Sequence, residues 1–250
     1  MKIEKEVLTG FLIIAVIAVG AAISYTYVKA KNRNTLAGAL AELSPRGGPP
    51  ETIEGLRRAI VLYEEELNRY VDTAAQTGVY WKILASRLQD RRLHVEALDA
   101  LERAIRYHPG DATLLYMTGV SAAVVAKSSL DFGESREHEN RIRYYSLAES
   151  AYLQAIALDD AYARPCYGLG VLYVFELNRP ADAIPYLRRV LELRGNDADA
   201  LFVLARAYYM TGQRKEALDA YDRIISFTKD KAKKAEAENN RRFIMDGTNG

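Results

Sequence analysis

Cysteine is almost absent from this sequence of 250 residues. The single Cys166 excludes a disulfide within the chain and any cysteine-rich metal site. The three histidines, His94, His108 and His138, lie far apart and show no ligand spacing. We therefore expect no bound metal ion and no cofactor.

Neither sign of charge dominates, because 34 Lys and Arg stand against 33 Asp and Glu, a formal net charge of +1. A protein that binds nucleic acid normally carries a basic stripe. The one short basic stretch, Lys229 to Lys234, is followed by Glu236 and Glu238. We interpret it as a solvated helix face and expect no nucleic-acid partner.

Signatures of catalysis are also missing from the sequence. It has no glycine-rich phosphate loop, no HExxH motif and no Ser or Cys nucleophile with a placed base. We predict that the protein is not an enzyme.

The N-terminal segment has the length and composition of a membrane anchor. No charged residue occurs in the 22 residues from Val7 to Val28, and Lys29, Lys31 and Arg33 follow. As a helix this run would reach ~33 Å, enough to cross a hydrocarbon core of about 30 Å. We predict a transmembrane helix within residues 1–28. A cleaved signal peptide is the alternative, with small residues around Gly20, although the apolar run continues beyond them.

The orientation of this anchor is set by two opposing signals. Three basic residues after the span against Lys2 and Lys5 before it favour a cytoplasmic C-terminal part. A short tail followed at once by a hydrophobic segment usually keeps its N-terminus in the cytoplasm. We expect a single-pass protein of a bacterial inner membrane with its soluble part in the periplasm.

Two segments separate the anchor from the rest of the chain. Residues 29–50 are predicted to be a tether, with a short helix over Thr35 to Leu43 and a Pro/Gly hinge over 44–50. Residues 51–77 are predicted to form a long amphipathic helix. Its apolar residues recur at spacings of three and four and so share one face: Ile53, Leu56, Ile60, Tyr63, Leu67, Tyr70, Val71 and Ala74.

From Gly78 the sequence repeats with a period near 34 residues. The first unit, 78–111, has large and small residues at fixed offsets: Trp81, Leu84, Ala85, Leu88, Ala97, Leu101, Ala104 and Pro109. The fourth unit, 198–231, fills equivalent offsets with Leu201, Leu204, Ala205, Tyr208, Ala217, Tyr221 and Ile224. The third, 163–197, has one extra residue that we expect in its turn, and the second, 112–162, has an insertion near 127–141.

This pattern resembles the tetratricopeptide repeat family, whose unit of 34 residues is a helix pair. The resemblance covers residues 78–231 and implies an all-α fold, a right-handed α-solenoid of helix hairpins. Residues 232–250 would supply a C-terminal capping helix, over about Lys231 to Met245, and a tail. The signature residues, Trp81 and Cys166 among them, are then packing positions without a direct role in function.

In this family the first helices of the units line a concave groove. Transferred to this sequence, those positions predict an aromatic groove with a few cations that would bind a helix or an extended peptide. Its residues are Lys82, Tyr116, Val120, Arg164, Tyr167, Val171, Phe175, Phe202, Arg206, Tyr209 and Met210. Alternatively, the helix at 51–76 or the insertion of the second unit fills the groove, and these residues are ordinary core.

The resemblance leaves three functions open. The first is a membrane-tethered scaffold that binds a partner protein in the groove. The second is a structural subunit of an envelope assembly, with a possible homo-oligomer. Here the chain resembles spirochaete tetratricopeptide proteins, some of which build the periplasmic flagellar collar. The third is an accessory protein of a transporter that binds a small ligand.

Overall fold

The computed structural model describes residues 35–43, 49–128 and 135–247, with side chains from residue 139 onward in the last range. In these ranges the chain forms helices and no strands. It divides into two compact units, Met1–Ala74 and Ala75–Gly250. The predicted membrane segment at 7–28 lies outside the described residues. Among the helices that are described, none is long and apolar enough to cross a bilayer.

The first unit contains α2 (Leu36–Leu43) and the N-terminal part of α3 (Ile53–Asp90). A threonine caps each start, since the hydroxyl of Thr35 accepts from the N–H of Gly38 and that of Thr52 from the N–H of Gly55. Residues 44–48 of the predicted hinge lie outside the described residues. The helix expected over 35–43 corresponds to α2.

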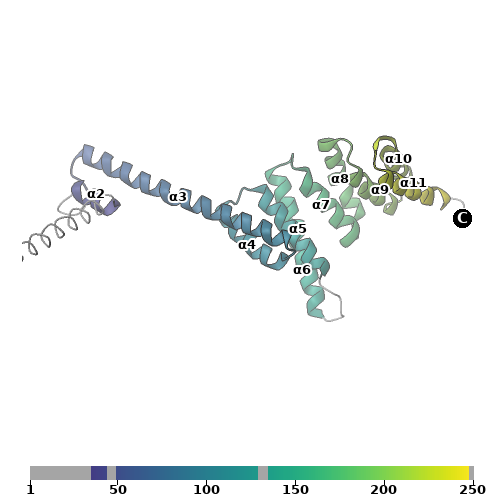
Figure 1. Cartoon of the computed structure of the whole chain (residues 1–250), viewed down its shortest axis with the longest axis horizontal. Coiled ribbons are helices and arrows are strands. Elements are labelled where there is room, and N and C mark those ends of the chain that lie inside the picture. The colour runs from purple at the N-terminus through teal and green to yellow at the C-terminus, as the bar shows by residue number, and fades with distance from the viewer. Residues whose placement is uncertain (1–34, 44–48, 129–134, 248–250) are drawn as a thin grey trace, which may run out of the picture. The chain divides into compact units, whose positions relative to one another are not determined.

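Helix α3 continues through Gly78, where the sequence suggested a boundary between 51–77 and the first repeat unit (Figure 1). The predicted helix at 51–77 and the first helix of the unit at 78–111 are thus one helix, and Gly78 makes a close contact within it. A Cβ at this position would lie 2.5–2.6 Å from the ring of His108 and the Cβ of Tyr107. The His108 ring nitrogen Nε2 lies 2.9 Å from the carbonyl oxygen of Ala75. The glycine thus lets the C-terminal end of α4 (His94–Tyr107) approach the backbone of α3.

The second compact unit, Ala75–Gly250, is a series of antiparallel helix hairpins. In chain order they follow the C-terminal end of α3 as α4 (His94–Tyr107), α5 (Ala112–Ser128), α6 (Ser135–Leu158), α7 (Ala163–Val171), the π-helical turn η1 (Leu172–Glu176), α8 (Pro180–Arg194), α9 (Ala198–Met210), α10 (Arg214–Phe227) and α11 (Lys231–Asp246). Figure 1 shows them side by side along this unit. In the second repeat unit, 112–162, residues 135–141 of the insertion lengthen α6 at its N-terminal end.

The turns within three hairpins share one backbone feature. Arg92, Asn178 and Gly212 all have positive φ, at 61°, 50° and 76°. They stand at equivalent places after the first helix of the first, third and fourth units. A left-handed residue here reverses the chain while the first helix keeps its final hydrogen bonds.

The extra residue of the third unit lies in the helix and not, as expected, in the turn. It is absorbed by η1, where the N–H of Leu177 donates to the carbonyl of Leu172 at 3.0 Å, five residues back. This wider turn rotates the side chains that follow it. As a result Val174 is buried with 3% exposure, whereas Phe175 is 56% exposed.

Helix α8 contains two prolines in different environments. Pro180 lies in its first turn, whereas Pro185 lies inside the helix. Pro180 lacks only an N–H that would have no helical partner. Pro185 therefore removes one internal hydrogen bond, a cost that the packing of α8 must offset.

The core lies between successive helices and depends on small residues at matched positions. Ala85 and Ala205 are fully buried. A Cβ at Gly119 would lie 2.5 Å from the ring of Tyr152, and one at Gly170 would lie 2.6 Å from Leu187. These contacts hold the two helices of each hairpin close together, which leaves no space for a larger side chain.

We predict that Gly170→Leu destabilises the compact unit Ala75–Gly250 by about 1–3 kcal/mol, because the new side chain must displace Leu187 from the core. Urea denaturation followed by circular dichroism measures the change. Gly110→Ala is the matched control, since a Cβ there meets nothing within 4 Å. Equal midpoints for the two variants would contradict this account of the packing.

Candidate protein-interaction groove

Five of the predicted groove residues line one cavity of about 280 Å³, here called the central cavity. Tyr116 and Val120 come from α5, and Arg164, Tyr167 and Val171 come from α7. The ring of Tyr116 lies 5.5 Å from that of Tyr162 and 6.2 Å from that of Tyr152. The first helices of the second and third units thus bring these side chains together, as the repeat offsets imply.

Four more of the predicted residues line a cavity of about 240 Å³, here called the C-terminal cavity. They are Phe175 from η1 and Phe202, Arg206 and Tyr209 from α9. Phe202 packs edge-on against Tyr221 with ring centroids 6.0 Å apart. This cavity therefore combines an aromatic wall with one guanidinium.

Helix α11 forms the other wall of the C-terminal cavity. Glu236, Asn240 and Phe243 line it, and the Phe243 ring lies 6.3 Å from that of Tyr209. Lys233 also contacts Asp199 of α9 at 2.7 Å. The capping helix takes the place that the first helix of a further unit would occupy, and so extends the inner wall.

The two remaining predicted residues line neither cavity. Lys82 forms an ion pair with Asp111 at 2.6 Å. Burial pushes the pKa of Asp111 upward, but the hydrogen bonds from Lys82 and Thr113 outweigh it and hold this pKa below its usual value. Met210, at the end of α9, is 37% exposed. The ammonium group of Lys82 thus stabilises the fold through Asp111 and does not line either cavity.

The first unit of the repeat contributes little to the groove because its polar side chains are already bonded. The side-chain amide of Gln89 donates to the carbonyl of Met117 and to the hydroxyl of Ser121, both at 2.8 Å. These bonds join α3 to α5 and satisfy the amide nitrogen. The groove is therefore formed by the second, third and fourth units.

Sequence reasoning missed five residues of the central cavity: Lys127, Tyr152, Gly168, Leu172 and Glu176. Tyr152 comes from a second helix, α6, and reaches the groove because Gly119 and Gly168 leave space for its ring. Burial raises the pKa of Tyr152, so its hydroxyl stays neutral. The glycine pair was the sequence signal that could have identified this residue.

Glu176 is the acidic group at the edge of the central cavity. It lies 3.3 Å from Lys127 and accepts a hydrogen bond of 2.6 Å from the hydroxyl of Tyr145. Burial raises the pKa of Tyr145 to about 12, and the bond to Glu176 acts in the same direction. The carboxylate is thus held in place by α5 and α6.

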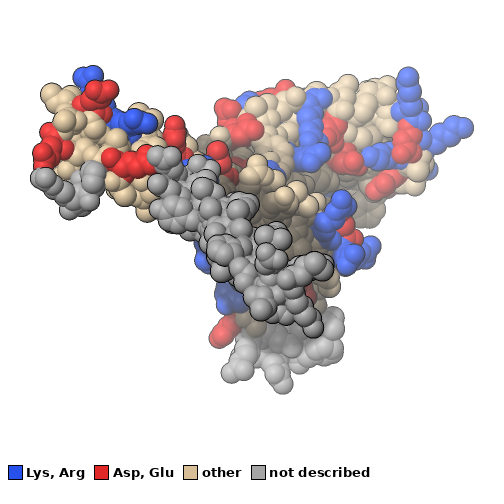
Figure 2. All heavy atoms as spheres, turned by 60° about the vertical axis from the view of Figure 1, so that its left-hand side comes forward, with Lys and Arg blue, Asp and Glu red and all other residues tan. Residues whose placement is uncertain are grey.

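Two arginines of the groove have no acidic partner. Among the described residues, neither Arg164 nor Arg206 forms an ion pair, and both are exposed. Elsewhere the face seen in Figure 2 carries basic and acidic side chains interspersed. These guanidinium groups can therefore bind carboxylates, while Glu176 and Glu236 line the same two cavities.

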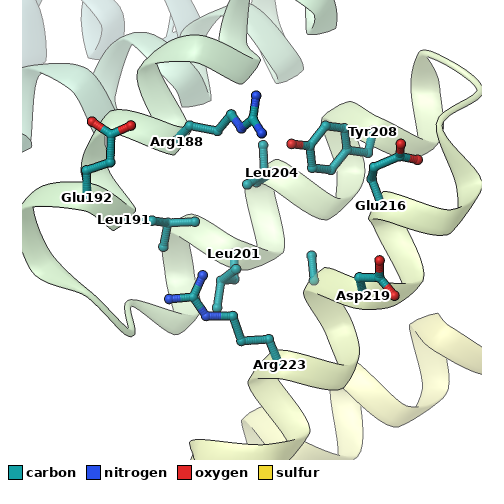
Figure 3. A pocket seen from close by; sticks show the side chains of 10 residues that line it. Arg188, Leu191, Glu192, Leu201, Leu204, Tyr208, Glu216, Asp219 and Arg223 are labelled. Carbon is teal, nitrogen blue, oxygen red and sulfur yellow. The ribbon is translucent and has the colours of Figure 1, made fainter.

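A third cavity, of about 410 Å³, lies between α8, α9 and α10 (Figure 3). Leu191, Leu201 and Leu204 form its apolar part, and the charged side chains around it are Arg188, Glu192, Glu216, Asp219 and Arg223. Arg223 is engaged in hydrogen bonds to Asn196 and to the carbonyl of Gly195. The residues that line this cavity include no nucleophile beside a base, so they form no catalytic arrangement.

The described residues contain no group of three or more His, Cys, Asp or Glu side chains that could hold a metal ion. Cys166 lies in the core with Val190 and Ala200 and is only 1% exposed. Burial raises the pKa of its thiol, which lowers the fraction of reactive thiolate. The residue is structural, in line with its position in the repeat.

Comparisons with known proteins agree with this geometry. A family model described as tetratricopeptide repeat matches residues 174–237. The chain has the tetratricopeptide repeat fold. Similar solved structures include MamA residues 41 to the end from Desulfovibrio magneticus RS-1, at 17% identity and a TM-score of 0.53 over 68% of this chain and 94% of that one. No curated protein matched the sequence.

A second similar structure is TTC0263, a tetratricopeptide protein of Thermus thermophilus, at 20% identity and a TM-score of 0.53. The alignment covers 73% of this chain and 89% of that one. These likenesses confirm the expected all-helical repeat fold. The family model and the Thermus thermophilus structure are both described as tetratricopeptide repeat proteins.

We predict that Cys166 reacts with a thiol reagent at least about 100-fold more slowly in the native protein than in urea, because reaction requires opening of the core. Absorbance of the released chromophore at pH 8 measures the rate. Rapid labelling of the native protein would contradict the packing of α7 against α8.

Proposed function

We propose that the protein is a membrane-tethered scaffold that binds a segment of a partner protein in the groove. The observation that carries this proposal is the convergence of nine predicted residues on the central and C-terminal cavities. None of them is needed for the repeat signature, and Phe175, Tyr209 and Arg206 remain exposed. Aromatic and arginine side chains dominate binding hot spots, which supports an interaction role.

The groove chemistry indicates the kind of segment that would fit. The aromatic walls favour apolar side chains, and Arg164 and Arg206 favour a carboxylate near each end. A helix or an extended peptide with acidic residues beside apolar anchors combines these features. The two groove cavities are smaller than the ~300–1,000 Å³ usual for small-molecule sites, so the groove fits a peptide segment better than a small ligand.

We predict that Tyr167→Ala, Phe202→Ala and Tyr209→Ala together abolish partner capture from detergent extracts. Each hot-spot truncation should weaken binding by about 2 kcal/mol or more. Pull-down with quantitative mass spectrometry, compared with the unaltered chain, measures the loss. Tyr209 is 37% exposed, but Phe202 packs on Tyr221, so a thermal melt must accompany the assay.

A matched control and a charge variant separate binding from folding. Val95→Ala, Leu147→Ala and Leu153→Ala remove three exposed apolar side chains outside the groove and should leave capture intact. Arg164→Glu with Arg206→Glu should also abolish capture, because both side chains are exposed and lack an acidic partner, and their loss leaves the core untouched. Undiminished capture by the charge variant would contradict the proposal.

The tether and its location are part of the same proposal. The uncharged run at 7–28 supports a single-pass anchor in a bacterial inner membrane, with the repeats on the periplasmic side. We predict that the full chain stays with membranes after alkaline carbonate washing, whereas a chain that lacks residues 1–34 is released. Release of the full chain would contradict the anchor, and protection of the repeats from protease in spheroplasts would contradict the periplasmic side.

A structural subunit of an envelope assembly is the second candidate function. It requires a surface through which copies of the chain associate. The exposed apolar face of α3 favours this candidate, since a monomer rarely leaves such a face in water.

A further inference from the structure

Helix α3 carries a coiled-coil repeat in its N-terminal part. Six large apolar residues follow one another at spacings of 3, 4, 3, 4 and 3: Ile53, Leu56, Ile60, Tyr63, Leu67 and Tyr70. This alternation defines heptad positions a and d, the seam along which two helices pack. We call these six residues the α3 seam.

The α3 seam is open to solvent. Its six residues are between 42% and 74% exposed, whereas Ala59 on the flank of the same helix is 6% exposed. Fully covered by a second helix, side chains of this size and exposure would bury roughly 600 Å² on each side, or about 1,200 Å² in all. That area is at the lower end of the range for specific interfaces, so the seam is large enough for a stable pair.

Charge argues against a membrane surface as the occupant. Residues 53–74 contain three arginines, at 57, 58 and 69, and five acidic residues, at 54, 64, 65, 66 and 72, which gives 3 − 5 = −2. Helices that lie on anionic membranes are rich in Lys and Arg on their polar face. The acidic balance of this segment is the opposite of that pattern.

The order of residues along the α3 seam suits an antiparallel copy of itself. When two copies run in opposite directions with full overlap, Ile53 faces Tyr70, Leu56 faces Leu67 and Ile60 faces Tyr63. Each layer then pairs a large side chain with a medium one or two of equal size, which fills space evenly. A parallel pair would instead place Tyr63 against Tyr63 and Tyr70 against Tyr70.

The flanking charges select the same arrangement. In the antiparallel pair Arg57 of each copy lies beside Glu64 of the other, so the contact occurs twice. Among the described residues neither Arg57 nor Glu64 forms an ion pair, and both are exposed. In a parallel pair Arg57 would face Thr52 and Glu64 would face Ala59, which provides no charge complementarity.

We propose that the α3 seam pairs with the same seam of a second copy of this chain as an antiparallel coiled coil. The residues of the α3 seam are distinct from those that line the two cavities. The resulting dimer contains two copies of the repeat region, one in each chain.

The first test disrupts the α3 seam by substitution in the full chain, which is kept in detergent micelles. Leu56→Glu with Leu67→Glu should raise the dimer dissociation constant by more than about 100-fold, because four carboxylates would enter the interface. Light scattering gives the mass, and circular dichroism should show unchanged helix content because both side chains are exposed. Arg58→Glu with Glu65→Arg, on the opposite face, should keep the dimer. A monomeric unaltered chain, or a dimer that survives the seam variant, would overturn the proposal.

The second test fixes the direction of the pair by charge exchange. Arg57→Glu alone and Glu64→Arg alone should each weaken the dimer roughly tenfold, because each creates two like-charge contacts. The double variant R57E/E64R restores both contacts and should recover the affinity of the unaltered chain. Sedimentation equilibrium measures the three constants. Single variants without effect, or a double variant weaker than either, would exclude the antiparallel register.

Discussion

A hairpin of two helices is too small to bury its own apolar face, and this constraint determines how the hairpins of residues 75–250 pack. Leu169 and Leu187 pair within the third hairpin, while Leu201 and Leu204 of the next helix complete the same core cluster. Each hairpin therefore supplies half of the cover for its neighbour. The chain must repeat its small and large residues at fixed offsets, because a change in offset would break the shared core.

The repeat offsets explain how much of the fold and the groove could be predicted from sequence. Ala85, Gly119, Gly170 and Ala205 mark the close approaches of the hairpins, and these positions alone identify four units. Once the units are aligned, the first-helix positions point to the inner wall. Nine of the eleven predicted groove residues meet there because backbone register determines which face a side chain takes.

The failures have local physical causes that a period of 34 residues does not contain. Gly78 resembles a helix end, but its missing Cβ makes room for the ring of His108. The extra residue of the third unit widened a helix turn, which buried Val174. Lys82 found a carboxylate 29 residues away and left the groove. At Gly78 and Lys82 a contact with a distant residue decided the outcome, whereas the third repeat unit took up its extra residue within the helix backbone.

The same constraint accounts for the two surfaces that remain uncovered. Inner-wall aromatic residues are only partly covered by the chain itself, as Tyr209 is by Phe243 of the capping helix. The N-terminal part of α3 precedes the first repeat hairpin, and its large apolar residues, Ile53 to Tyr70, are exposed. A helix that the repeat does not cover must find its cover in another molecule, and the strict heptad spacing of the α3 seam fits a second helix of the same kind.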